Sequence, residues 1–239
     1  MTITLVLPTY NEVENLPKMV SALYTLPLAD LHLIIVDDNS PDGTGELAET
    51  LAAGHPGKMT VIHRPGKMGL GTAYVTGFKT ALAQGAELVG QMDTDFSHPV
   101  EKVPELVKAL DACEVAIGSR YIRGGSVDER WPAWRKALSS FANFYARSIL
   151  RLPMKDVTAG FRMYRREALQ RIPLDRIRSN GYSFQVETAY LTHRLGLTCC
   201  EVPIYFADRR WGVSKMSLKI QLESAFRVWQ LLWIYRGMR

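Results

Sequence analysis

Five short apolar runs constrain the fold of this chain more than any other feature, because a stretch with helical apolar spacing follows most of them. The runs are aliphatic or β-branched and end at turn residues, which is typical of buried strands. They are Ile3–Leu7, Leu33–Val36, Met59–Ile62, Leu88–Met92 and Val115–Ile117. The helical stretches are Asn11–Leu23, Gly43–Ala53, Gly69–Ala83 and Val100–Leu110. This alternation predicts an α/β fold with a doubly wound, mostly parallel, Rossmann-like sheet.

The second half of the chain is less regular. We expect a helix ending near Leu150 and another over Phe184–Leu195. The segment Met216–Tyr235 differs from both, because aromatic and aliphatic residues recur along it at helical spacing while charged residues occupy another face. A length of 239 residues suits one large domain plus an appendage. We therefore predict a catalytic domain over residues 1–212 and a C-terminal amphipathic helix at a membrane interface over residues 213–239.

Charge and cysteine content narrow the location of the protein. Residues 205–239 contain seven Lys or Arg and two acidic residues, a surplus equal to the net charge of +5 of the whole chain. No apolar run approaches the ~20 residues that span a bilayer. The N-terminus also lacks the pattern of a signal peptide. Cys113, Cys199 and Cys200 supply neither a disulfide framework nor a zinc spacing. A cytoplasmic protein, bound peripherally to the cytoplasmic face of a membrane, fits these features.

Polar residues follow four of the predicted strands, and all four strand ends should meet at one edge of a parallel sheet, where such folds bind ligands. Asp93-Thr94-Asp95 follows a buried strand, and Asp37-Asp38 follows another in the same way. Carboxylates two residues apart can supply hard oxygen ligands to Mg²⁺ or Mn²⁺. The sequence therefore predicts a divalent cation at Asp93 and Asp95 that also contacts a substrate diphosphate.

Several motifs together resemble the inverting glycosyltransferase family 2, and within it the polyprenol-phosphate (dolichol-phosphate) mannose synthases. The resemblance covers nearly the whole chain, and its combination of motifs is specific. The motifs are Leu7-Pro8-Thr9-Tyr10-Asn11-Glu12, Val36-Asp37-Asp38-Asn39-Ser40, Met92-Asp93-Thr94-Asp95-Phe96-Ser97-His98-Pro99, Ile117-Gly118-Ser119-Arg120-Tyr121, Trp131-Pro132, Arg135-Lys136, Gly160-Phe161 and Phe206-x-x-Arg209-x-x-Gly212-x-Ser214-Lys215. The fold that the resemblance implies is of the GT-A type.

The resemblance also implies a nucleotide-sugar site for GDP-mannose. The residues that match the family's floor for base and ribose are Pro8, Tyr10, Glu12, Val36 and Asp38. Those that match its ribose, metal and diphosphate ligands are Asp93, Thr94 and Asp95. Ser97 stands where the family often has a Gln as a further metal contact, so Asp93, Asp95 and Ser97 are the expected metal set, with water completing the shell.

A group of basic residues matches the family's binding sites for the diphosphate and for the acceptor phosphate. Arg120, Arg209 and Lys215 would contact both, and Arg135 would contact the acceptor phosphate. Guanidinium groups suit phosphate oxygens, and two anionic substrates must be brought together here. With Asp95, the three shared residues are the expected catalytic set.

The expected reaction is inverting transfer of mannose from GDP-mannose to a polyprenyl or dolichyl phosphate, giving GDP and the polyprenyl-phosphate mannose. A lipid phosphate is already ionised at neutral pH, so the attack depends more on alignment and leaving-group stabilisation than on a base. The family resemblance also implies a separate membrane-anchoring subunit, and we expect no nucleic-acid partner. A UDP-sugar donor such as UDP-glucose, or a non-catalytic module that binds sugar nucleotides, remains an alternative.

Four further residues or segments leave two interpretations open. Glu187 could be a catalytic base or, with greater weight, a buried structural group. His98 could reach the metal or cap the turn before the next helix. The glycine-rich segment Gly66–Gly71 could be a phosphate-binding loop or, with greater weight, a flexible turn with Lys67 near the nucleotide. Trp229 and Trp233 could face a membrane or belong to the core.

Overall fold

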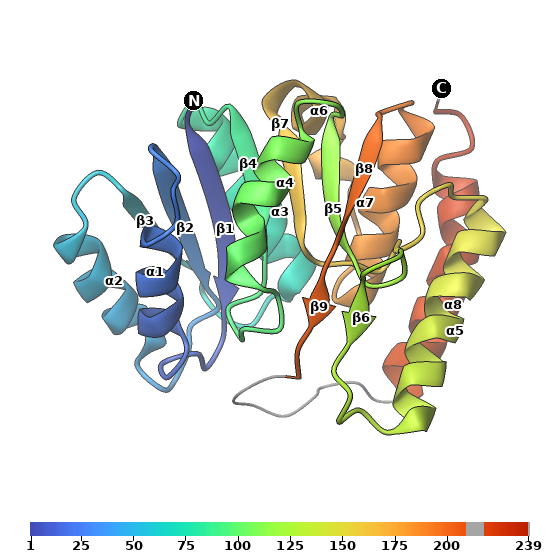
Figure 1. The fold of residues 1–239 in the computed structure, drawn as a ribbon, viewed down its shortest axis with the longest axis horizontal. Coiled ribbons are helices and arrows are strands. Elements are labelled where there is room, and N and C mark those ends of the chain that lie inside the picture. The colour runs from blue at the N-terminus through green and yellow to red at the C-terminus, as the bar shows by residue number, and fades with distance from the viewer. Residues whose placement is uncertain (209–217, 239) are drawn as a thin grey trace.

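The computed structural model describes residues 1–208 and 218–238, with the side chains of Leu218–Leu222 left aside. A seven-stranded sheet forms its centre, in the order β3-β2-β1-β4-β7-β5-β8 (Figure 1). Its strands are β1 (Ile3–Thr9), β2 (Leu31–Asp37), β3 (Met59–His63), β4 (Leu88–Gln91), β5 (Val115–Ser119), β7 (Arg162–Arg165) and β8 (Cys199–Pro203). A second, two-stranded sheet pairs β6 (Ser126–Val127) with β9 (Tyr205–Phe206).

Six of the seven strands of the main sheet run in one direction, which confirms the predicted α/β, mostly parallel fold. Pairs β1–β2, β2–β3, β1–β4 and β5–β8 are parallel. Strand β7 is antiparallel to both of its neighbours, β4 and β5. Since β7 separates β4 from β5 without reversing them, β1, β2, β4 and β5 all end at the same edge of the sheet. The four polar segments singled out in the sequence therefore share that edge.

Helices cover both faces of the sheet, because successive strand residues point to opposite sides. Ile3, Leu5 and Leu7 pack into one core, whereas Val6 packs into the other. The helices are α1 (Leu16–Tyr24), α2 (Thr44–Gly54), α3 (Leu70–Ala83), α4 (Val103–Ala109), α5 (Ala133–Leu150), α6 (Arg166–Arg171), α7 (Tyr182–Arg194) and α8 (Leu218–Ile234), with 3₁₀ turns η1 (Val100–Lys102) and η2 (Leu174–Arg176). Side chains of α1, α2 and α4 fill one core, and those of α3, α6, α7 and α8 fill the other.

Two predicted helices begin later than the apolar pattern suggests. Helix α1 starts at Leu16, because Asn11 is left-handed, with φ of 61°, and Pro17 fits only the first turn of a helix. The expected helix from Val100 begins as the 3₁₀ turn η1 and becomes the α-helix α4 one residue before Pro104, for the same reason.

The cysteines differ from the sequence-based expectation. Cys113 and Cys200, 87 residues apart, form a disulfide with their Cα atoms 5.9 Å apart, whereas the spacing of the three cysteines predicted none. Strand β8 pairs with β5 in parallel and places Cys200 opposite Ala116, three residues along the chain from Cys113. This pairing across the sheet, and not the sequence spacing, sets which thiols meet. Cys199 is the free thiol.

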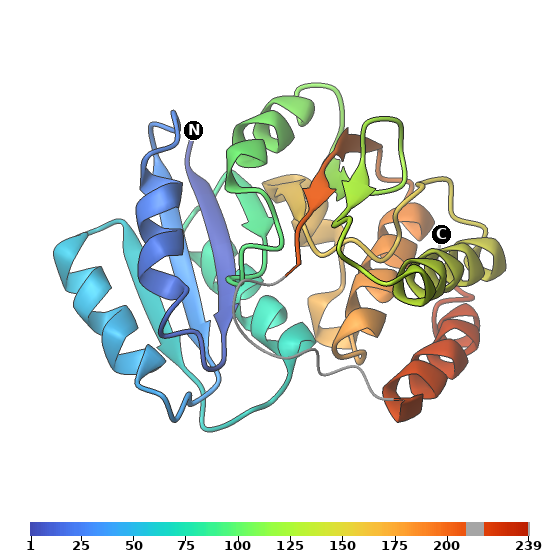
Figure 2. The same cartoon turned by 60° about the horizontal axis from the view of Figure 1, so that its bottom comes forward.

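The C-terminal helix α8 is present, as predicted, and lies beside α5 (Figures 1 and 2). Its inner face buries Val228 and Leu231, and Tyr235, the residue after the helix, is also buried. Its outer face exposes Trp229 and Trp233, which are 50% and 70% accessible. These two tryptophans are therefore surface residues and not part of the core. Within the described residues, we find no helix with the length and apolar character that crossing a bilayer requires.

Candidate active site

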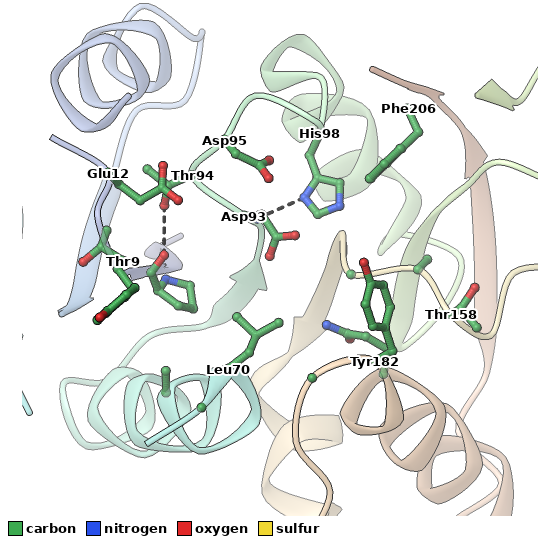
Figure 3. Close-up of a pocket in the computed structure, with 18 of the residues that line it drawn as sticks. Thr9, Glu12, Leu70, Asp93, Thr94, Asp95, His98, Thr158, Tyr182 and Phe206 are labelled. Atoms are coloured by element: carbon green, nitrogen blue, oxygen red, sulfur yellow. Dashed lines mark hydrogen bonds between the residues drawn. The ribbon is translucent and has the colours of Figure 1, made fainter. Parts of the chain in front are cut away.

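A cavity of about 320 Å³ opens at the edge where β1, β2, β4 and β5 end (Figure 3). Eight of the residues predicted for the site line it: Pro8, Tyr10, Glu12, Asp38, Asp93, Thr94, Asp95 and Arg120. The structure thus brings together residues from four separate strand ends in one site.

Three other predicted residues lie outside the set that lines the cavity. Val36 is fully buried among the core residues beneath the sheet edge. Ser97 is 1% exposed and its Oγ is buried without a hydrogen bond in the described structure. Arg135 stacks on Trp131, 3.8 Å from the ring centroid, and its Nη1 donates to Asp208 at 3.2 Å. Arg209 and Lys215, predicted for both phosphate sites, fall outside the described residues.

The acidic loop after β4 is held by hydrogen bonds to one oxygen of each carboxylate. The Tyr74 hydroxyl donates to Asp93 Oδ1 at 2.9 Å, and the Ser97 amide donates to Asp95 Oδ1 at 3.0 Å. Burial and the Asp93 charge raise the pKa of Tyr74 well above its usual value, so the hydroxyl stays a donor. The Thr94 hydroxyl donates to the carbonyl of Pro8 at 3.1 Å and joins this loop to β1.

His98 also supports this loop, since its Nδ1 accepts a hydrogen bond of 3.0 Å from the backbone N–H of Asp93 (Figure 3). An N–H group can only donate, so Nδ1 carries the lone pair of a neutral ring. Burial lowers the pKa of His98, although the Asp93 and Asp95 carboxylates act against it. Of the two interpretations that we left open, the structure favours a role in the turn, because Nδ1 is occupied by the backbone.

Behind Asp38, which lines the cavity, lies a cation that sequence reasoning missed. Arg64 is 7% exposed and forms an ion pair with Asp38, while its Nη1 donates to Thr72 Oγ1 at 2.6 Å and its Nη2 to the Gly69 carbonyl at 3.0 Å. The Gly69 amide donates in turn to Asp38 Oδ2 at 3.3 Å. Asp38 therefore anchors the glycine-rich segment as well as facing the cavity. Lys67, from the same segment, lines the cavity with its Nζ 4.0 Å from the Tyr10 ring centroid.

Arg120 also lines the cavity, and a buried carboxylate fixes its guanidinium. Its Nε and Nη2 each donate to Asp156 at 2.8 Å, and Nη2 also donates to Thr158 Oγ1 at 2.7 Å. Although burial acts to raise it, the pKa of Asp156 is lowered by the charge and hydrogen bonds of Arg120. Nη1 makes no hydrogen bond to any described residue. Arg120 can thus present the two N–H groups of Nη1 to an anion in a fixed orientation.

Glu187 does not face the cavity, which excludes it as a base within this geometry. It is 1% exposed and accepts hydrogen bonds from the Ser179 amide at 2.9 Å and the Tyr235 hydroxyl at 2.6 Å. The carboxylate thus connects Tyr235, directly after α8, to residues 178–182. The last two of these residues, Gly181 and Tyr182, line the cavity. The structural interpretation of Glu187 is the one that the geometry supports.

A metal ion would find oxygen ligands here, although they are fewer than a complete shell. Asp93 and Asp95 both line the cavity, whereas the inaccessible Ser97 Oγ does not. In the described part of the chain, no group of three or more His, Cys, Asp or Glu side chains could hold a metal ion. The donor set of two carboxylates nevertheless fits a hard divalent cation whose remaining ligands come from substrate and water.

Comparison with known proteins places the chain in a family. The model of glycosyl transferase family 2 matches residues 4–173, which span β1 through β7 and so include the acidic loop and Arg120. The chain belongs to glycosyl transferase family 2, and it is a glycosyltransferase.

Two curated relatives match almost the whole chain. A polyprenol monophosphomannose synthase from Mycolicibacterium smegmatis is 44% identical over 233 residues, which cover 97% of this chain and 86% of the relative. An undecaprenyl-phosphate mannosyltransferase from Micrococcus luteus is 43% identical over 242 residues, which cover 100% of this chain and 98% of the relative.

The fold also matches a solved structure, glucosyl-3-phosphoglycerate synthase from Mycobacterium tuberculosis in complex with Mn²⁺, UDP and glucosyl-3-phosphoglycerate. The TM-score is 0.66, with 20% identity, and the match covers 100% of this chain and 81% of that one. At that identity the likeness concerns the fold, and it confirms the predicted GT-A type.

Proposed function

We propose that the protein transfers mannose from GDP-mannose to a polyprenyl phosphate with inversion at the sugar C1. The observation that carries the proposal is the match over almost the whole chain to two curated relatives, whose names both specify mannose transfer to a polyprenol or undecaprenyl phosphate. The cavity is consistent with it, because acidic residues and Arg120 meet at its wall. We assign the acidic residues to the metal and the diphosphate, and Arg120 to phosphate oxygens.

Asp93 and Asp95 are the residues that would hold Mg²⁺ or Mn²⁺ together with the diphosphate. A bound divalent cation would neutralise the charge that develops on the departing nucleoside diphosphate. The Tyr74 hydroxyl and the Ser97 amide fix one oxygen of each carboxylate, so both arrive in a set orientation. This arrangement limits the reorganisation needed when substrate binds.

Arg120 would bind phosphate oxygens through Nη1, and its pairing with Asp156 determines how. Because Asp156 compensates the guanidinium charge, Arg120 acts as an oriented pair of donors more than as an unpaired positive charge. The acceptor phosphate is ionised at neutral pH, so it can attack C1 without a protein base. The position of Glu187 outside the cavity is consistent with that mechanism.

We also propose that α5 and α8 rest together on the cytoplasmic face of a membrane. The two helices are joined by the Tyr145 hydroxyl, which donates to the Ala225 carbonyl at 3.2 Å and accepts from Trp229 Nε1 at 2.9 Å. Large apolar side chains of both helices are exposed: Trp134, Phe141, Phe144, Phe226, Trp229 and Trp233. Aromatic side chains of this kind favour the lipid headgroup region.

The experiment that tests the proposed reaction is incubation of the purified chain with a short polyprenyl phosphate and radiolabelled donor, with Mn²⁺ or with EDTA. We expect organic-phase label from GDP-mannose and not from UDP-glucose, and no transfer in EDTA. Transfer only from UDP-glucose would overturn the donor assignment. Undiminished transfer in EDTA would overturn the metal assignment.

A further inference from the structure

Two buried polar side chains at the cavity have no part in the chemistry described above. His98 is 2% exposed and Gln185 is 3% exposed, and both line the cavity beside Gly160. A Cβ atom built on Gly160 would lie 3.3 Å from Gln185 Nε2 and 3.5 Å from His98 Nε2. Both nitrogens therefore border the same small space, which exists because residue 160 has no side chain.

The protonation of the His98 ring follows from its one hydrogen bond. Nδ1 accepts from the Asp93 amide, so the proton of the neutral imidazole is on Nε2. The ring cannot turn freely, because it stacks on Phe161 at 5.2 Å and meets the edge of Phe206 at 5.5 Å between centroids. His98 Nε2–H is thus a donor with a fixed position.

The orientation of Gln185 follows from its neighbour Gln91, which is fully buried. The Gly160 carbonyl can only accept, so the Gln91 atom that contacts it at 2.9 Å must be the amide nitrogen. That nitrogen also donates to Gln185 at 2.7 Å, which requires the Gln185 oxygen to face it. The Tyr164 hydroxyl completes the chain by bonding to Gln91 Oε1 at 3.3 Å. Gln185 Nε2 is consequently turned away from Gln91, toward the space at Gly160.

Neither His98 Nε2 nor Gln185 Nε2 has a hydrogen-bond partner among the described residues. Both residues line the cavity, so these two N–H groups are open to a molecule bound inside it. Two donors of this kind beside one small space indicate that a substrate oxygen completes them. Both groups are neutral, in contrast to Arg120, so a neutral hydroxyl suits them better than a phosphate oxygen.

We propose that His98 Nε2 and Gln185 Nε2 together bind one ring hydroxyl of the hexose that the enzyme transfers. The location supports this, because His98 contacts the backbone of Asp93, which we assign to the diphosphate end of the donor. The hexose attached to that diphosphate would extend past the acidic loop toward Gly160. This inference rests on the proposed function, and it adds the two residues that recognise the sugar.

His98→Asn and Gly160→Ala test the proposal in two independent ways. An Asn amide oxygen can accept the Asp93 N–H in place of Nδ1 but leaves the Nε2 position without a donor. Gly160→Ala places a methyl group in the hydroxyl space, and the backbone there has no left-handed φ to forbid alanine. Gly54→Ala is the matched control, because a Cβ at Gly54 meets no atom within 4 Å.

We expect kcat/KM for the sugar-nucleotide donor to fall about tenfold in both variants, as for loss of one or two neutral hydrogen bonds. The Kd of GDP with Mn²⁺, from calorimetry, should stay within about twofold of wild type, as should every property of Gly54→Ala. Donor analogues with one hydroxyl removed at a time then identify the contact. For one analogue, kcat/KM of the wild-type enzyme should be about tenfold lower than with the complete donor. For that analogue, kcat/KM of His98→Asn should be no lower than its own value with the complete donor.

Three results separate the possible failures. Parallel weakening of GDP binding in His98→Asn and Gly160→Ala would overturn the inference, because the donors would then hold the diphosphate. The inference would also be overturned if, for every deoxy analogue, the loss of kcat/KM from His98→Asn simply added to the loss from the missing hydroxyl. No hydroxyl would then be coupled to His98. Absence of hexose transfer by the wild-type protein from any donor would instead overturn the proposed function.

Discussion

Replacing Asp156 by alanine is expected to lower the free energy of unfolding by about 3–5 kcal/mol, because it leaves the Arg120 guanidinium buried without its counter-charge. Asp156 has no exposed surface and accepts three hydrogen bonds from Arg120, two from the side chain and one from the backbone amide. Its own amide also donates to Glu201 at 3.0 Å, and Thr158 Oγ1 donates to its carboxylate at 3.1 Å, so Asp156 anchors the start of the loop that leads to Gly160.

Thermal unfolding followed by circular dichroism measures the effect. For a chain of 239 residues, each kcal/mol shifts the Tm by about 2–4 °C, so Asp156→Ala should melt about 6–20 °C below wild type. The matched control is Asp175→Ala, whose ion pair with Lys79 is exposed and should contribute less than about 1 kcal/mol. An Asp156→Ala protein that melts within 2 °C of wild type would refute the reasoning.

The same pair predicts a pH dependence. The pKa of Asp156 is lowered from its ordinary value of 3.8, so the fold favours the ionised carboxyl. This stabilisation is complete above pH 3.8 and is lost as the pH falls through the pKa of the folded state. The Tm difference between wild type and Asp156→Asn should stay constant at higher pH and shrink below 3.8. A difference that grows on acidification would contradict the assigned direction.

Three further outcomes follow from the structure. Asp95→Asn should lower kcat at least about 10²-fold while leaving the Tm within 3 °C, because it removes the carboxylate that we propose as a cation ligand and keeps the shape of the side chain. Trp229→Ala combined with Trp233→Ala should weaken sedimentation with anionic vesicles about tenfold or more, since both side chains are exposed on one helix. Tyr235→Phe should lower the Tm by about 2–8 °C, because the buried carboxylate of Glu187 loses a charged hydrogen bond of 2.6 Å.

Two of these variants, Asp95→Asn and Tyr235→Phe, have a matched control in the same chain. Asp111→Asn changes a carboxylate that lies outside the cavity, and full activity is expected. Tyr24→Phe removes a hydroxyl that donates to a backbone carbonyl at 2.7 Å, and it should destabilise less than Tyr235→Phe. Near-normal turnover of Asp95→Asn, or unchanged vesicle binding after loss of both tryptophans, would contradict the roles given to those residues.

The fold could be predicted largely because its main signals are local. The strands β1 to β5 appear as apolar runs, and the residues that follow them are the polar ones that line the cavity. Strand β7 was missed, since Arg162-Met163-Tyr164-Arg165 shows no apolar run although Arg162 is 1% exposed. The Arg162 guanidinium is held there by the Val157 and Gln185 carbonyls and by Thr188, contacts that no local pattern reveals.

The site could be predicted only in part, for a related reason. Asp93 and Asp95 were predicted because they directly follow an apolar run that marks a strand. Arg120 was predicted because it belongs to a family motif. Asp156 and Arg64 were missed, because each acts through a partner 26 or more residues away along the chain. A buried carboxylate or guanidinium in a loop has no periodicity that would mark it before its partner is known.

Periodicity and turn residues act over a few positions, so the sequence alone predicts the strands β1 to β5, the acidic loop at a strand end, and the amphipathic character of α8. Three contacts could not be read from such local patterns: Asp156 with Arg120, Cys113 with Cys200, and His98 with Gln185 at the space beside Gly160. Those contacts depend on which strands become neighbours in the sheet, and the packing of the whole chain selects those neighbours.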